Sequence, residues 1–223
     1  MFRYFILFYL IFTFNVSFAS PQLDYGLLVD IENDDVLLAK NIHQKIAPSS
    51  MTKLMSAYVV FRKIKEGKIT LDDKVKISVN AWKMGGSTMF LNYGDVVSVE
   101  DLIDGLITDS GNDSAVALAE FVAGDVAGFV EMMNFYAKEI GLRNSHFRNP
   151  HGLNEDGHYM NLSDLVVLTK QIINEFSEYI DFFDNEKLEY GKITQKNRNP
   201  LIGLYDEALG MKTGHTNDGG YGM

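Results

Sequence analysis

The sequence predicts an α+β fold of the antiparallel kind, in which a block of helices is inserted in a sheet domain. Two observations predict it. Strand-like stretches lie near the two ends of the chain, at 23–40 and 209–216. The middle, from about residue 50 to residue 174, instead carries apolar residues at helical spacing. Strands and helices that are grouped in this way are typical of an α+β plan.

The first nineteen residues have the features of an export signal. Arg3 supplies the positive charge, residues 4–18 form the apolar run, and Ala19 ends a small-x-small cleavage site. The run is shorter than the ~20 residues that a membrane span needs. We therefore expect a signal peptide over 1–19 and a single domain over 20–223 in the periplasm or cell envelope. Membrane contact is expected only through the signal, if it is not cleaved.

The composition argues against several classes of protein. With 20 basic and 30 acidic residues the formal net charge is −10, which argues against a nucleic-acid binder. There is no cysteine, so the chain has neither disulfides nor a thiol nucleophile. No cofactor and no metal are expected, because the histidines do not have the spacing of metal ligands on a helix. They are His43, His146, His151, His158 and His215.

The elements are expected in the following order. A β-hairpin at 23–31 and 36–40 opens the domain, because turn residues separate two strand-like stretches. Short alternating segments follow the first helix, a polar loop precedes the last one, and a strand comes near the end. The helices are expected at 50–65, from 99 to a break at 110–113, and at 114–123, 128–140 and 164–174. The alternating segments lie at 74–79 and 85–91, the loop at 142–162 and the late strand at 209–216.

The first helix carries a possible nucleophile and base. Pro48 ends an extended segment and helical periodicity follows it, so the helix begins at or near Ser50. Ser50 and Lys53 then share one face, with Cβ atoms ~5–6 Å apart. The lysine could accept the hydroxyl proton, and the positive end of the helix would favour an oxyanion. The alternative is an N-capping serine followed by a solvated lysine.

Two further patterns stand downstream in order. Ser-x-Asn occurs at 78–80 and at 110–112. We interpret the second as functional, because the break between two apolar helices would direct Ser110 and Asn112 into a cleft; local turn hydrogen bonds are the alternative. Lys-Thr-Gly occurs once, at 212–214, where a strand glycine permits close approach of a ligand. Its alternative is an edge-strand lysine beside a turn glycine.

The ordered set S-x-x-K, S-x-N and K-T-G resembles the active-site-serine penicillin-binding proteins and β-lactamases. With the motifs at 50–55, 110–113, 149–153 and 212–216 the chain is similar to the D-alanyl-D-alanine carboxypeptidase family, the low-molecular-mass penicillin-binding proteins. The resemblance covers nearly the whole mature chain. It implies a penicillin-binding protein/β-lactamase-like domain that removes the terminal D-alanine from peptidoglycan stem peptides and is inhibited covalently by β-lactams.

The chemistry requires two lysines in different states. Ser50 would form an acyl-enzyme, and its base must be neutral. A lysine with a pKa of ~10.4 is neutral in only about one part in 2,500 at pH 7, so a depression of about three units is needed. Burial can supply it, and so can a second ammonium, for which Lys212 is the candidate. Lys53 is therefore expected to be neutral and Lys212 charged.

The resemblance also implies roles for the remaining residues. Ser110 would pass a proton to the leaving D-alanine, so that Ser50, Lys53 and Ser110 form the catalytic group. Backbone N–H groups of Ser50 and His215 would form the oxyanion hole, and water would hydrolyse the acyl-enzyme. The residues expected to bind substrate are Asn112, Lys212, Thr213, Gly214 and His215.

A β-lactamase remains an alternative function at this point. It shares the fold and the first chemical step, but it needs fast deacylation, which in class A depends on a loop glutamate between the second and third motifs. The glutamates in that interval match no such motif. They are Glu155, Glu175, Glu178, Glu186 and Glu189. The lifetime of a penicillin adduct would separate the two activities.

A second alternative is a truncated, non-catalytic relic or binding module. The resemblance implies two further strands and a helix after Lys-Thr-Gly, so the last strands of the sheet are expected to be missing. These strands would lie between the Lys-Thr-Gly strand and the N-terminal hairpin. Without them, three inter-strand spacings of ~4.8 Å would leave a gap of ~14 Å in the sheet and expose apolar surface. The strand of Lys212 would otherwise pair directly with the N-terminal hairpin. Little D-Ala-D-Ala cleavage is therefore expected from the chain as it stands.

Overall fold

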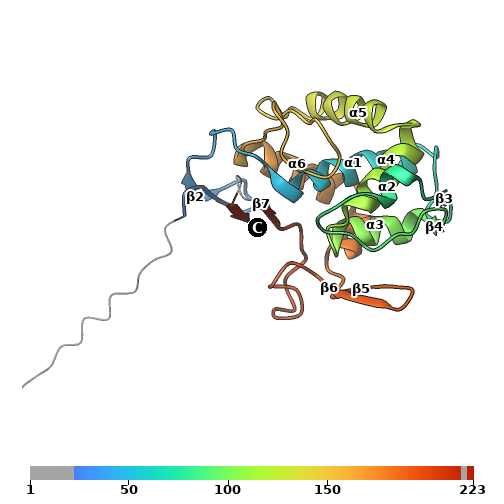
Figure 1. Cartoon of the computed structure of the whole chain (residues 1–223). Helices are drawn as coiled ribbons and strands as arrows, with labels where there is room; N and C mark the ends of the chain where they lie inside the picture. The colour runs from blue at the N-terminus through green and yellow to red at the C-terminus, as the bar shows by residue number, and fades with distance from the viewer. Residues whose placement is uncertain (1–22, 217–219) are drawn as a thin grey trace, which may run out of the picture.

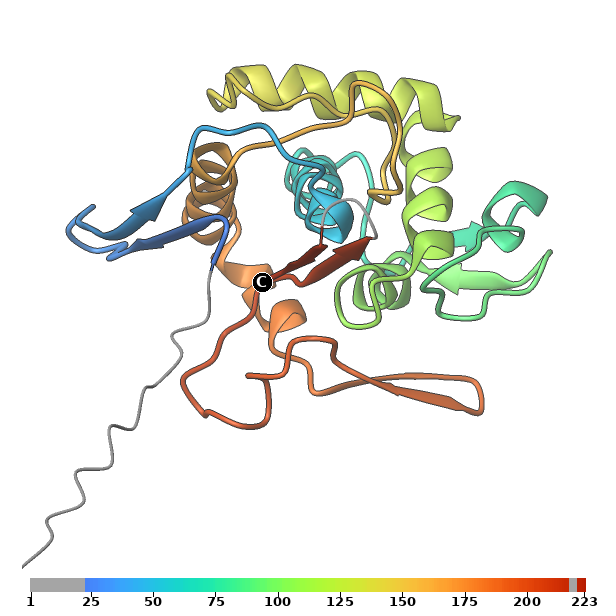
Figure 2. The same ribbon diagram turned by 60° about the vertical axis from the view of Figure 1, so that its left-hand side comes forward.

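Helix α1 (Thr52–Lys65) is the centre of the fold. The computed structural model describes residues 23–216 and 220–223, so the signal expected at 1–19 lies outside the described residues. A 3-10 turn, η1 (Ser49–Met51), leads into α1, so helical structure begins close to Ser50, where the helix start was predicted. Residues 52–61 are all buried, because other helices pack around them. Figures 1 and 2 show α1 surrounded in this way.

The four longer helices at 99–107, 112–123, 126–139 and 162–175 agree with the predicted ones to within about two residues, the usual uncertainty of helix ends, whereas the short helices at 79–82 and 177–183 were not predicted. Three of the four have a side-chain cap, in which Ser98, Asp125 and Asn161 accept from the backbone three residues on. The helices are α2 (Val79–Trp82), α3 (Val99–Ile107), α4 (Asn112–Ala123), α5 (Val126–Glu139), α6 (Leu162–Glu175) and the 3-10 helix η2 (Ser177–Phe183).

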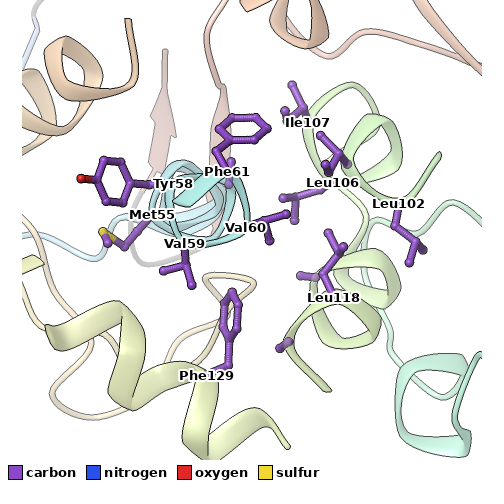
Figure 3. Packing of buried hydrophobic residues seen from close by; sticks show 14 of the residues in the cluster. Met55, Tyr58, Val59, Val60, Phe61, Leu102, Leu106, Ile107, Leu118 and Phe129 are labelled. Carbon is purple, nitrogen blue, oxygen red and sulfur yellow. The ribbon is translucent and has the colours of Figure 1, made fainter. Parts of the chain in front are cut away.

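The core is formed where α1 meets α3, α4, α5 and α6. Figure 3 shows side chains of α1 directed toward the leucines of α3 and α4 and toward Phe129 of α5. Phe61 and Phe129 are fully buried. At ~25 cal/mol per Å² of apolar surface removed from water, this burial holds α1 in a fixed position. Ser50 and Lys53 therefore stand at the end of the best-packed element.

The strands form separate antiparallel pairs within the described residues. The pairs are β1 (Gly26–Val29) with β2 (Val36–Lys40), β3 (Lys74–Lys76) with β4 (Val96–Ser98), β5 (Lys187–Tyr190) with β6 (Ile193–Lys196), and β7 (Gly214–Thr216) with β8 (Gly220–Gly222). The mixed helix and sheet composition confirms the predicted α+β class. No helix of 23–216 or 220–223 is long and apolar enough to cross a bilayer.

Three predicted strand segments are wrong in detail. Val79 and Asn80 lie in α2, because Ser78 caps this helix by accepting from the Ala81 N–H at 3.0 Å. Residues 85–91 form no strand, since their backbone is bound by polar groups of α4. The strand expected from residue 209 begins only at Gly214. Lys212 and Thr213 therefore lie in an irregular segment before β7.

The N-terminal hairpin β1–β2 does not pair with β7 among the described residues, so the direct pairing that was one of the two expected outcomes is not found. Strand β7 lies instead against η1, the turn that carries Ser50, and Figure 2 shows the β7–β8 ribbon beside the start of α1. The hairpin leaves apolar side chains in solvent. These are Leu28, Val36, Leu37 and Leu38.

Candidate active site

Ser50 lies in a tight turn against which two other segments pack closely. Ser49 has a φ of 51°, a conformation that L residues seldom adopt, and such strain is typical of functional turns. A Cβ on Gly214 would lie 3.2 Å from the Ser50 nitrogen, and one on Gly152 would lie 1.8 Å from the Ser49 oxygen. Glycine is therefore required at 152, where backbone meets backbone, and the fit at 214 is tight for any side chain.

Lys53 is only 1% exposed and has three polar neighbours. Its Nζ lies 2.8 Å from Asn112 Oδ1, 2.7 Å from the carbonyl oxygen of His151 and 3.3 Å from Ser50 Oγ. A neutral amine has two N–H groups and one lone pair. The two shorter contacts take up the N–H groups, so the lone pair faces the Ser50 hydroxyl. Lys53 is thus placed to accept the proton of Ser50.

The surroundings of Lys53 favour its neutral form. Burial lowers its pKa well below the ordinary value, and the charge of Lys212 lowers it further. Asp109 and Asp113 act in the opposite direction, but their effect is smaller. The predicted depression is therefore present, with burial rather than the second ammonium as its first cause.

Ser110 and Asn112 stand at the break between α3 and α4. Ser110 has a φ of 65°, and its buried Oγ has no hydrogen-bond partner among the described residues. Asn112 begins α4 and spans the site: Oδ1 accepts from Lys53, and Nδ2 donates to the Gly85 carbonyl at 2.7 Å. Because a buried hydroxyl without a partner is costly, Ser110 Oγ is suited to bind a substrate or a proton in transit.

Lys212 lies close to a second cation that the sequence analysis missed. It is 5% exposed, and its Nζ donates to the Thr213 carbonyl at 3.1 Å. The pKa of Lys212 is lowered to about 7, first by burial and then by the charge of Arg198, while Asp109 opposes the shift. Lys212 is therefore only partly charged at neutral pH in the free chain. This differs from the permanently charged lysine that the sequence suggested.

Arg198 is held beside the site by a buried carboxylate. Its Nη2 donates to Asp109 Oδ1 at 3.0 Å, and its backbone N–H donates to the Thr108 carbonyl. Asp109 is buried, which raises its pKa, while Arg198 opposes that shift. The sequence contains little indication of this ion pair. Arg198 stands in a polar turn, and Asp109 directly precedes the Ser-x-Asn motif without being part of it. Only the fold brings them together.

Two further polar groups support the site without having been predicted. The carboxylate of Asp113 accepts from the Met89 and Leu91 N–H groups at 3.0 and 3.1 Å, which fixes the loop that Asn112 also binds. His158 contacts Thr52 across the site loop. Asp113 could have been suspected because it follows Asn112 directly. His215 is exposed and stacks on Tyr221, with ring centroids 4.0 Å apart.

No group of histidine and acidic side chains within 23–216 and 220–223 is arranged to hold a metal ion. The chemistry that the arrangement can perform is nucleophilic. A serine hydroxyl of η1 and a buried amine of α1 lie in contact, a second buried hydroxyl without a partner among the described residues stands just before α4, and a buried lysine lies in the segment before β7. This is the constellation of an acyl-transfer site.

Comparisons with known proteins point in the same direction. Residues 17–223 match the D-alanyl-D-alanine carboxypeptidase family. D-alanyl-D-alanine carboxypeptidase DacD of Escherichia coli is 42% identical over 222 residues, which cover 94% of this chain and 57% of that protein. The chain thus spans little more than half the length of this relative.

Solved structures agree with this match. Penicillin-binding protein 5 of Haemophilus influenzae has a TM-score of 0.86 at 39% identity, over 91% of this chain and 60% of that one. Penicillin-binding protein 6B of Escherichia coli has a TM-score of 0.83 at 43% identity, over 93% and 69%. Penicillin-binding protein D2 of Listeria monocytogenes, in its ampicillin-bound form, has a TM-score of 0.80 at 25% identity, over 91% and 84%.

Proposed function

Since the chain belongs to the D-alanyl-D-alanine carboxypeptidase family, we propose that it removes the terminal D-alanine from peptidoglycan stem peptides through an acyl-enzyme on Ser50. We also propose that residues 1–19 export it and that 20–223 carry the catalytic residues. The observation that supports the activity best is the buried amine of Lys53, 3.3 Å from Ser50 Oγ. No metal or cofactor takes part in the proposed reaction.

The proposed reaction has two half-reactions. Ser50 Oγ attacks the carbonyl carbon of the D-Ala-D-Ala bond while its proton moves to Lys53 Nζ. The C–N bond then breaks, and the proton is passed through Ser110 to the amine of the departing D-alanine. Water attacks the remaining ester, releases the shortened peptide and restores the Ser50 hydroxyl. Asn112 would hold the peptide, and Lys212 with Thr213 would hold its terminal carboxylate.

Labelling with a β-lactam tests this assignment. We expect penicillin to form a covalent adduct on Ser50, because its strained carbonyl stands in for the D-Ala-D-Ala bond. Mass mapping of the proteolysed adduct should place the added mass on the peptide that contains Ser50, and Ser50→Ala should remove it. An adduct on Ser49, or undiminished labelling of Ser50→Ala, would contradict the proposal. Rapid loss of the adduct would instead favour a β-lactamase.

The pKa of Lys212 leads to a prediction about substrate binding. Because that pKa is about 7 and the charged form binds the carboxylate, the affinity for a stem peptide should fall as the pH rises through about 7. Calorimetric titration of Ser50→Ala measures binding without turnover. In the Lys212→Arg background the decline should disappear, since guanidinium does not titrate in this range. The same pH dependence in both backgrounds would exclude Lys212 as the anion-binding group.

A further inference from the structure

The loop 148–158 is seated on the first turns of α1 around Lys53. The His151 carbonyl accepts from Lys53 Nζ at 2.7 Å, and the Pro150 carbonyl accepts from Ser56 Oγ at 2.7 Å. These two carbonyls thus bind Lys53 and Ser56, which are three residues apart on one face of the helix. The loop therefore supplies one of the acceptors for Lys53 and, with Gly152, closes the site from that side.

His158 joins this loop to α1 through both of its ring nitrogens. Nδ1 accepts the Arg148 N–H at 3.0 Å, which ties the two ends of the loop together. Nε2 lies 2.8 Å from Oγ1 of Thr52, the residue directly before Lys53. Because Nδ1 is an acceptor, the proton of the neutral ring is on Nε2 and is donated to Thr52.

We propose that His158 is a positioning residue for the acylation step, which holds the His151 carbonyl on Lys53 by linking the loop to Thr52. The proposal rests on the function proposed above for Ser50 and Lys53. His158 lies beyond the reacting atoms and acts only through the loop. With the link intact the loop excludes water from Lys53; without it, water enters and the amine is more readily protonated.

The charges around His158 support a single, neutral state. The pKa of His158 is lowered to about 4, chiefly by burial; Glu155 opposes the shift and His146 adds to it. Above about pH 5 the ring is therefore neutral and keeps the tautomer that both hydrogen bonds require. The charged groups that affect Lys53 come from other elements. They are Lys212, Arg198, Asp109 and Asp113. The nearby His151 has its pKa lowered to about 3 by burial and by Lys53.

A matched pair of variants at Thr52 tests the proposal. Thr52→Val keeps the buried shape and removes the hydroxyl, whereas Thr52→Ser keeps the hydroxyl. We expect Thr52→Val to slow acylation by a β-lactam about tenfold, the effect of one lost hydrogen bond. In the pH profile of the acylation rate of Thr52→Val, the rise on the acid side (the acid limb) should move to higher pH. Hydration returns the pKa of Lys53 toward its ordinary value. Thr52→Ser should retain the wild-type rate and limb.

Substitutions of His158 separate its two hydrogen bonds. His158→Asn offers an oxygen near the position of Nδ1 and so keeps the loop closed, but it cannot reach Thr52; we expect it to behave as Thr52→Val does. Melting curves identify any variant that fails to fold. If His158→Asn does not fold, the result for Thr52→Val alone tests the proposal. If Thr52→Val keeps both the wild-type rate and the wild-type acid limb, the proposal is overturned.

The outcome stays distinguishable from failure of the proposed function. If the wild-type protein forms no adduct on Ser50, the acylation assay reports that failure and not the role of His158. The pKa of Lys53 Nζ is then followed by NMR of the lysine side chain, without any substrate. An increase in Thr52→Val that is absent in Thr52→Ser would support the positioning role, and equal values in all three proteins would refute it.

Discussion

Replacing Lys53 by arginine is expected to reduce acylation of Ser50 by about 10³-fold, within the range that general-base catalysis contributes. Guanidinium has a pKa above ~12 and is never neutral in a protein, so it cannot accept the proton of Ser50. The reason is specific to this site, because the amine of Lys53 is buried and has only one free direction, toward Ser50 Oγ. Stopped-flow measurement of β-lactam acylation gives the rate.

The control is Lys53→Met, which has a similar length and carries no charge. Both variants should lose acylation, while only Lys53→Arg places a permanent charge in the core. A folded Lys53→Met with the wild-type acylation rate would show that another group is the base. In the wild type the rate should rise with pH and level off well below the ordinary lysine pKa, since burial lowers the pKa of Lys53. A rise centred near ~10.4 would contradict a depressed pKa.

Replacing Gly152 by alanine should destabilise the protein and remove acylation together. The new Cβ would lie 1.8 Å from the Ser49 oxygen and 2.5 Å from its carbonyl carbon, and both belong to backbone that cannot give way. The φ of +89° adds strain for any L side chain. We expect a loss of about 3 kcal/mol, since overpacking and a strained φ each cost in this range. Urea unfolding measures it.

Gly157 provides the matched control. It lies in the same loop with a φ of +81°, but the nearest atom to its added Cβ is 4.0 Å away. Gly157→Ala should therefore show only the cost of the backbone conformation, about 1 kcal/mol, and should keep its acylation rate. The difference between the two variants isolates the contact with Ser49. Equal destabilisation by both would mean that the close approach to Ser49 is not a constraint.

The sequence predicted the parts of this site that depend on local rules. Helix starts follow from caps and periodicity, so the positions of Ser50 in the turn before α1 and of Lys53 in its first turn were predictable. Ser78 serves as a helix cap, which is a structural role, while the functional role of Ser110 stays a prediction. The class of fold followed from the grouping of strands and helices.

Contacts between distant segments were not predictable. Nothing in the sequence around Arg198 indicates that Asp109, on another element, will pair with it. The link from Thr52 to His158 spans 106 positions and has no periodic signal. The strand predicted at 209–213 is absent for a different reason. Its alternation is typical of a strand, but strand structure needs a partner, and none of the described strands pairs with these residues.

The packing of other helices around α1 has a consequence for local unfolding. Amide protons of the buried stretch 55–61 are expected to exchange slowly, because helices cover α1 on several sides and opening of the strand hairpins alone leaves those helices in place. Lys53 lies two residues before that stretch on α1, and Ser50 lies in the turn that leads into this helix. The spacing of the pair is therefore expected to persist through partial unfolding events that open the peripheral hairpins.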